Sequence, residues 1–135
     1  FDLSSNNDQL ASIIAQLKAM GVRVSLFMDP VPKQILRAAE LGADRIELYT
    51  GPYAEAWGSD RLHTVFQRHL DAATLANSLG LGVNAGHDLN LINLEHYASI
   101  NQLLEVSIGH AFTVDALQLG MPSAVRAYLD ALSRS

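Results

Sequence analysis

Short segments rich in apolar residues alternate along this chain with longer segments of helical spacing. Short apolar-rich segments bounded by glycine, proline or aspartate are typical of strands, and they predict strands over residues 22–28, 45–49, 81–85 and 104–108. The segments of helical spacing predict helices around these strands. The first follows the capping residues 4–8 and stops at Gly21, and the others span residues 32–41, 60–79, 93–98, 113–119 and 122–132.

Two of the predicted helices show which of their faces enters the core. The helix over residues 32–41 carries an apolar side made of Ile35, Leu36 and Ala39. The helix over residues 60–79 has a longer apolar stripe, made of Leu62, Val65, Phe66, Leu70 and Ala73. We expect these side chains to pack against the sheet, and we expect the helical histidines at the surface: His63, His69 and His96.

Strands that alternate with helices favour a parallel sheet with right-handed crossovers, which places the chain in the α/β class. No linker or low-complexity segment divides residues 1–135, so we expect a single domain. Four βα units make either half of a (β/α)8 barrel, whose complete form needs about 250 residues, or a small open doubly wound sheet. Composition does not separate these two architectures.

Composition and charge exclude several classes of protein. The net charge of −5 argues against a nucleic-acid surface, which needs clustered lysine and arginine. Because no apolar run reaches about 18 residues and no signal segment opens the chain, we expect no membrane contact and a cytoplasmic location. The absence of cysteine excludes disulfides and thiolate zinc sites. Charged residues make up 17% of the chain, against about 25% in typical domains, which indicates that something else normally covers part of the surface.

Unusual polar residues fall at or near the carboxyl ends of the four predicted strands. Asp29 follows the first strand, Glu47 lies within the second, His87 follows the third and His110 follows the fourth. In parallel α/β architectures the reactive side chains gather beyond these strand ends. The sequence therefore predicts one shared site at this rim.

Glu47 stands between Ile46 and Leu48 inside a predicted strand. Alternate strand residues of a barrel point to its lumen, so Glu47 faces inward if both neighbours pack against helices. A buried carboxylate is costly unless it is paired, and burial would raise its pKa. The alternatives are a residue of an edge strand that points to solvent, or an ion pair with Arg45.

A Gly-His pair is repeated at two successive strand ends, as Gly86-His87 and Gly109-His110. Glycine lets a ligand approach the backbone, histidine exchanges protons near neutral pH, and the N–H groups that open a helix can hold a phosphate. The alternative is that each pair is a turn with a capping histidine. We expect no metal ion, because no His-x-x-x-His pattern supports one. Tyr49, Tyr53 and Trp57 are candidates for a pocket or a subunit contact, and for Trp57 core packing or a subunit contact is favoured.

Four segments carry a resemblance to a known family. Residues 24–30 (VSLFMDP), 42–54 (GADRIELYTGPYA), 80–89 (GLGVNAGHDL) and 107–111 (SIGHA) resemble strand segments of the pyridoxine 5′-phosphate synthases, in the same order and over nearly the whole chain. The resemblance implies a cofactor-independent (β/α)8 barrel of vitamin B6 biosynthesis. Members of that family condense 1-deoxy-D-xylulose 5-phosphate with 3-amino-2-oxopropyl phosphate to pyridoxine 5′-phosphate, phosphate and water.

The resemblance also implies roles for individual residues. His87 corresponds to the proton donor and Glu47 to a catalytically important strand glutamate, while Gly109 and His110 correspond to residues that bind phosphorylated substrate. Asp88 stands where the family has a substrate-contacting glycine, which puts that contact in doubt.

The N-terminal half of that family's barrel, which carries most of the catalytic set, has no counterpart here. Since the first residue is Phe1, the chain is either processed or a piece of something longer. We expect the C-terminal half of a barrel, inactive alone, which pairs with its missing half and forms a homo-oligomer. Two other hypotheses remain open, namely a non-catalytic phosphate-binding half-barrel and a metal-dependent sugar-phosphate isomerase or epimerase.

Overall fold

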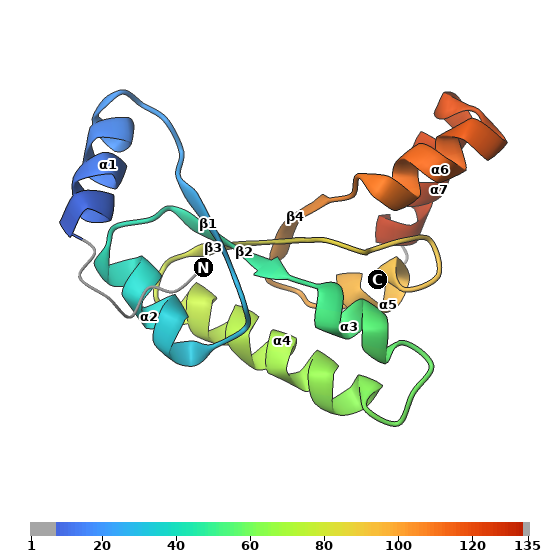
Figure 1. The fold of residues 1–135 in the computed structure, drawn as a ribbon, viewed down its shortest axis with the longest axis horizontal. Helices are drawn as coiled ribbons and strands as arrows, with labels where there is room; N and C mark the ends of the chain where they lie inside the picture. The colour runs from blue at the N-terminus through green and yellow to red at the C-terminus, as the bar shows by residue number, and fades with distance from the viewer. Residues whose placement is uncertain (1–7, 134–135) are drawn as a thin grey trace.

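Four parallel strands make the single sheet of the computed structural model, which describes residues 8–133. The strands lie side by side in chain order, β1-β2-β3-β4 (Figure 1). Their bounds are Ser25–Met28 for β1, Arg45–Tyr49 for β2, Gly82–Gly86 for β3 and Leu103–Ser107 for β4. The predicted α/β class and the parallel pairing of successive strands are confirmed.

Helices follow each strand. Their bounds are Asp8–Ala19 for α1, Pro32–Glu40 for α2, Gly51–Ala56 for α3, Leu62–Ser78 for α4, Leu94–Ala98 for α5, His110–Leu119 for α6 and Met121–Ser133 for α7. Helices α2, α3, α4 and α5 gather on one side of the sheet, while α1 and the α6–α7 pair stand at opposite ends of the molecule (Figure 1). Among these described helices, none is long and apolar enough to cross a membrane.

The two faces of the sheet differ in burial because side chains alternate along each strand. Ile46, Leu48, Val83 and Ala85 point toward the helices and are at most 1% exposed. The opposite face carries the row Phe27, Glu47, Asn84 and Glu105, which the strand register places side by side. The core therefore lies between the sheet and the helices, and the other face is free to carry polar groups.

Two boundaries differ by three residues from those expected from the sequence, and one helix was missed. β1 begins at Ser25 rather than at residue 22, since Val22 is 45% exposed and outside the core. α6 begins at His110 rather than at residue 113, because Gly109 is its N-cap and its carbonyl accepts the N–H of Thr113. α3 was not expected at all, since six residues are too few to show a helical period. The expected capping residues 4–7 lie outside the described part of the chain.

The expected core faces of two helices need correction. In α2 the side chain of Leu36 is 45% exposed, and Ala38 is buried with Ile35. In α4 the fully packed positions are His69, Ala72, Ala73 and Ala76, while the larger apolar residues of the expected stripe are only partly buried. Alanine lets a helix approach a sheet closely, so these small residues occupy the closest contacts. His69 was expected at the surface, and that expectation was wrong.

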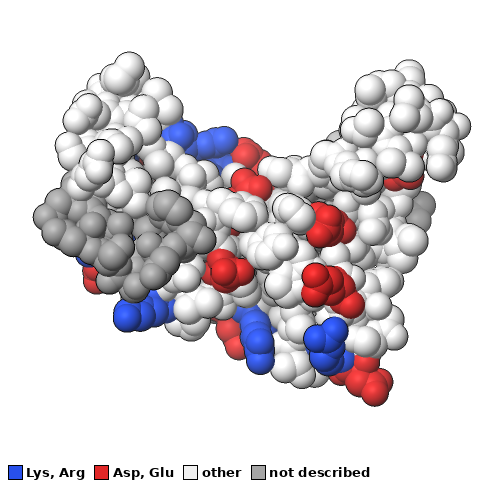
Figure 2. All heavy atoms as spheres, in the orientation of Figure 1, with Lys and Arg blue, Asp and Glu red and all other residues white. Residues whose placement is uncertain are grey.

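Apolar side chains remain exposed on α6 and α7. Leu117 is 83% exposed, and Leu129 and Met121 are more than half exposed. Figure 2 shows this raised end of the molecule, at the upper right, almost free of charged side chains. An exposed apolar surface of this kind is typical of a region that another protein segment covers.

Candidate functional site

The loops after β3 and β4 meet around one open pocket of about 550 Å³. His87 and Asp88 come from the first loop, and Gly109 and His110 from the second. Ser107 and Ile108 complete the lining. The structure thus brings together four of the five candidate residues, at the carboxyl ends of neighbouring strands.

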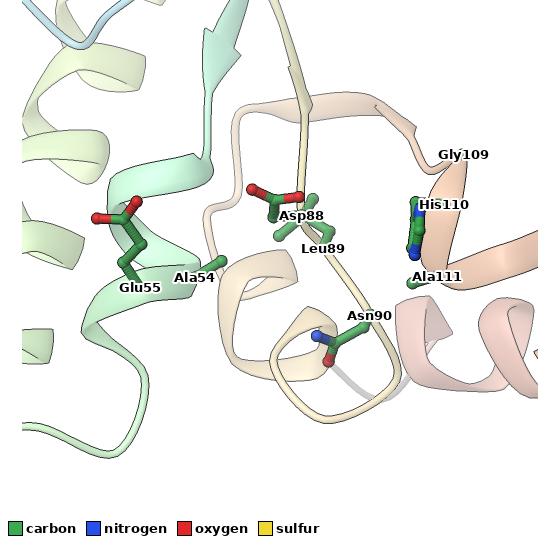
Figure 3. Close-up of a pocket in the computed structure, with 8 residues that line it drawn as sticks. All are labelled: Ala54, Glu55, Asp88, Leu89, Asn90, Gly109, His110 and Ala111. Carbon is green, nitrogen blue, oxygen red and sulfur yellow. The ribbon is translucent and has the colours of Figure 1, made fainter. Parts of the chain in front are cut away.

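A second pocket of about 350 Å³ shares Asp88, Gly109 and His110 with the first. Figure 3 shows its lining: α3 contributes Ala54 and Glu55 on one side, and His110 stands at the start of α6 on the other. Glu55 was missed from the sequence because its helix was missed. The signal that could have revealed α3 is Pro52, since proline is favoured in the first turn of a helix.

Glu47 lies beside these pockets and is not among the residues that line them. A Cβ atom at Gly86 would overlap Oε1 of Glu47, so the carboxylate rests directly against the glycine that precedes His87. β2 is an interior strand, which excludes the edge-strand alternative. Glu47 does face away from the helices, as expected, but it is only half-buried.

Arg45 pairs with a different carboxylate from the one considered in the sequence. Its Nη1 lies 2.9 Å from Oε1 of Glu105 and 3.0 Å from Oδ1 of Asn84. The side-chain amide of Asn84 donates to Glu105 at 3.2 Å, and Arg23 lies 3.3 Å from the same carboxylate. This polar network on the sheet face opposite the helices was missed, although the alternation of polar residues within β2, β3 and β4 could have revealed it.

Two neighbours contact the imidazole of His87. Its Nδ1 lies 2.9 Å from Oδ2 of Asp88, and its ring makes an edge contact with Tyr49 at a centroid distance of 5.0 Å. Within residues 8–133, Nε2 of His87 makes no hydrogen bond. The side chain is 54% exposed, so this nitrogen is available to a bound molecule. The alternative of a capping role does not hold here.

The backbone at His87 and Asp88 has an unusual conformation. Both residues have positive φ angles, 88° and 59°. Residues other than glycine adopt this left-handed backbone conformation at a cost of about 1–2 kcal/mol per residue. Two such residues in succession need support from their surroundings, and the carbonyl groups of Gly86, His87 and Asp88 all accept hydrogen bonds from buried side chains.

Gly109 and His110 open α6. No side-chain hydrogen bond caps this helix, so His110 does not act as a cap. The first N–H groups of a helix lack partners within the helix and favour an anion. Both residues are exposed and line the pocket, so the start of α6 is open to a ligand.

Aromatic side chains fill the space beneath the site, between α3, α4 and α5. Tyr53 and Tyr97 are fully buried, and Trp57 packs on Tyr53 at 5.9 Å, so core packing is confirmed for Trp57. His69 Nδ1 lies 2.9 Å from the hydroxyl of Tyr97. Burial lowers the pKa of His69 to about 4 and raises the pKa of the Tyr97 hydroxyl. This cluster is a support for the loops above it and holds no candidate proton donor for the pocket.

The remaining polar candidates stand apart. Asp29 follows β1 as expected, but it is exposed and lines neither pocket. His63 and His96 are exposed, as expected. Across residues 8–133, no three His, Asp or Glu side chains come together as a set that could hold a metal ion.

The fold and the site define a parallel α/β protein with an open pocket at its strand ends, built from two Gly-His loops and a helix N-terminus. A family model described as pyridoxal phosphate biosynthesis protein PdxJ matches residues 1–134, and the chain belongs to that family.

Curated relatives agree with the family assignment. The chain is 50% identical to a pyridoxine 5′-phosphate synthase of Xanthomonas oryzae pv. oryzae (strain MAFF 311018), with 100% of the chain and 53% of the relative covered. It is 51% identical to the Brucella anthropi synthase, with 98% and 55% covered. The Porphyromonas gingivalis synthase is 48% identical, with 98% and 56% covered. The chain therefore spans about half the length of these relatives.

Proposed function

We propose that this chain is the C-terminal half of the (β/α)8 barrel of a pyridoxine 5′-phosphate synthase. Its four strands follow one another in chain order, whereas a doubly wound sheet reverses its strand order. Residues alternate between a sheet face covered by helices and an opposite face that carries Glu47, Asn84 and Glu105, as expected where alternate strand residues point to a barrel lumen. The coverage of about half of each relative supports the same conclusion.

The complete enzyme condenses 1-deoxy-D-xylulose 5-phosphate with 3-amino-2-oxopropyl phosphate and closes the pyridine ring, with release of phosphate and water. The observation that carries this proposal is the pocket shared by His87, Asp88, Gly109 and His110. It combines a proton-exchanging side chain with helix N–H groups that suit a phosphate. Imine formation, dehydration and loss of phosphate all require protons to be moved between carbon, nitrogen and oxygen.

Each candidate residue has a role in this proposal. Nε2 of His87, which makes no hydrogen bond within residues 8–133, gives a proton to a leaving oxygen. The N–H groups at Gly109 and His110 hold the phosphate of the substrate. Glu47 stabilises positive charge on the nitrogen of the reacting substrate from its place beside Gly86.

Asp88 differs from the glycine of the family, and its geometry offers an account of the substitution. Its φ of 59° lies in the left-handed region, where aspartate is tolerated better than most side chains. Its carboxylate is turned toward His87 Nδ1 at 2.9 Å. The substrate contact at this position comes from the backbone of Asp88, and its side chain orients the imidazole.

The rest of the barrel supplies the N-terminal half that is missing from this chain. We propose that an N-terminal half covers the open face of the sheet and pairs with the outer edges of β1 and β4, and that the complete enzyme is a cytoplasmic homo-oligomer that needs no cofactor. The exposed apolar side chains of α6 and α7, such as Leu117 and Leu129, give such partners a surface to bury.

A chimera tests the proposal. The 135 residues are joined to the part of the Xanthomonas oryzae synthase that they do not match. Product is measured by the fluorescence of pyridoxine 5′-phosphate and by released phosphate, with the intact X. oryzae enzyme as the positive control. We expect the chimera to form product, and each half alone to form none. A folded chimera that releases no product, or a chain that turns over alone, would contradict the proposal.

A further inference from the structure

The position of the His87 imidazole depends on its backbone more than on packing. The side chain is 54% exposed and contacts Asp88, which is exposed to the same degree, and the edge of Tyr49. Neither contact encloses the ring. The positive φ angles of His87 and Asp88 therefore decide where the imidazole stands. Such a conformation persists only where neighbouring groups hold it.

Thr50 is the first such group. It directly follows β2, is the N-cap residue of α3, is fully buried, and lies beside the end of β3. Its N–H donates to the carbonyl of Gly86 at 2.9 Å. Its hydroxyl donates to the same carbonyl at 2.7 Å and also to the carbonyl of His87. Because a hydroxyl has one proton, the two carbonyls share it, and Thr50 is bound to the peptide groups on both sides of His87.

Asn93 is the second group. It is 2% exposed, and its Nδ2 donates to the carbonyl of Asp88 at 3.2 Å. Its Oδ1 accepts the N–H of Asn90 at 2.9 Å, which closes the loop on itself. The carbonyl of Asn93 in turn accepts the buried hydroxyl of Tyr53 at 2.8 Å. The aromatic cluster below the site thus anchors Asn93, and Asn93 anchors Asp88.

We propose that Thr50 and Asn93 are positioning residues for the reaction, holding His87 and Asp88 in the left-handed conformation that presents the His87 imidazole to the pocket. Thr50 holds the peptide groups before and after His87, and Asn93 holds the one after Asp88. Neither side chain lines the pocket. This inference rests on the proposed function, because it assigns the two residues to the same site.

The kinetic test uses Thr50→Val in the chimera, which keeps the shape of the side chain and removes its hydroxyl. We expect kcat to fall by about 10- to 100-fold, the range expected for a reacting group displaced by about 1 Å, while KM changes by less than about threefold. Thr50→Ser keeps the hydroxyl and should restore most of the rate. Thr74→Val is the matched control, since Thr74 makes a similar bond to a carbonyl on the exposed side of α4. It should leave kcat unchanged.

A double-mutant cycle separates positioning from a general structural effect. If Thr50 acts through His87, Thr50→Val should change the residual rate of a His87→Ala chimera by less than about twofold. A loss of the same size in both backgrounds would overturn the proposal. Asn93→Ala is the second variant, with the same expected fall in kcat, and it keeps the test decisive if Thr50→Val fails to fold.

Crystal structures of the chimera and of Thr50→Val give a readout that needs no turnover. We expect the variant to lose the positive φ at His87 and the edge contact of its ring with Tyr49, with the core unchanged. An inactive chimera whose loop still shifts in the variant would contradict the proposed function and would support only that Thr50 holds the conformation of this loop. An active chimera whose variant keeps both the loop and kcat would overturn the positioning role alone.

Discussion

Acidification should destabilise this protein through the buried His69. The side chain is 0% exposed among aromatic rings, and burial lowers its pKa from 6.5 to about 4. In the unfolded chain the imidazole regains an ordinary pKa of about 6.5. Between these two values the unfolded state binds a proton that the folded state does not, so the free energy of unfolding falls as pH falls from about 6.5 toward 4.

The size of this effect follows from the two pKa values. Each pKa unit corresponds to 1.36 kcal/mol, so the difference of about 2.5 units lowers the free energy of unfolding by about 3 kcal/mol in total below pH 4. Part of this loss has already occurred at pH 5.0, where it amounts to about 2 kcal/mol relative to pH 7.5. Such a loss is a large fraction of the stability of a typical domain.

Urea unfolding at pH 7.5 and pH 5.0 measures the loss, with His69→Gln as the perturbation. Glutamine cannot titrate in this range and can still bind the Tyr97 hydroxyl, so the variant should lose about 2 kcal/mol less than the parent chain on acidification. His63→Gln, an exposed histidine of the same helix, is the matched control and should behave like the parent. Equal losses for His69→Gln and the parent would refute the reasoning.

Two further changes test the sheet face opposite the helices, which carries Glu47 and Glu105. Gly86→Ala places a methyl group on Oε1 of Glu47 and 3.1 Å from Cβ of Ser107. Because the Glu47 carboxylate is displaced, kcat of the chimera should fall at least about tenfold. An unchanged kcat would show that Glu47 is not needed at this position. Glu105→Gln removes the charge that pairs with Arg45, and because the Glu105 side chain is 47% exposed, the free energy of unfolding should drop by less than about 1 kcal/mol in urea unfolding. A larger drop would mean that the ion pair is shielded from water.

Much of the fold could be predicted because its signals are local. The strands from Arg45 to Tyr49 and from Gly82 to Gly86 are short segments between turn residues whose apolar residues alternate with other residues, and the alternation of such strands with helices implies parallel pairing. The meeting of the two Gly-His loops follows from that topology, since neighbouring parallel strands end at the same edge of the sheet.

What could not be predicted depends on contacts between distant residues. Nothing near His69 in the sequence shows that Tyr97, 28 residues later, provides its partner. The hydroxyl of Thr50 meets the carbonyls of residues 36 and 37 positions away. Polar side chains of this kind look like surface residues in a sequence, and only the packed chain shows them buried and paired.

The rate of pyridoxine 5′-phosphate synthesis by a His87→Ala chimera tests most directly whether the loops after β3 and β4 form a working site. Removing a positioned proton donor typically costs 10²- to 10⁴-fold in rate. We therefore expect kcat to fall by at least about 100-fold, while a His63→Ala chimera keeps the full rate. A His87→Ala chimera that makes product at the parent rate would contradict the assignment of the pocket as the catalytic centre.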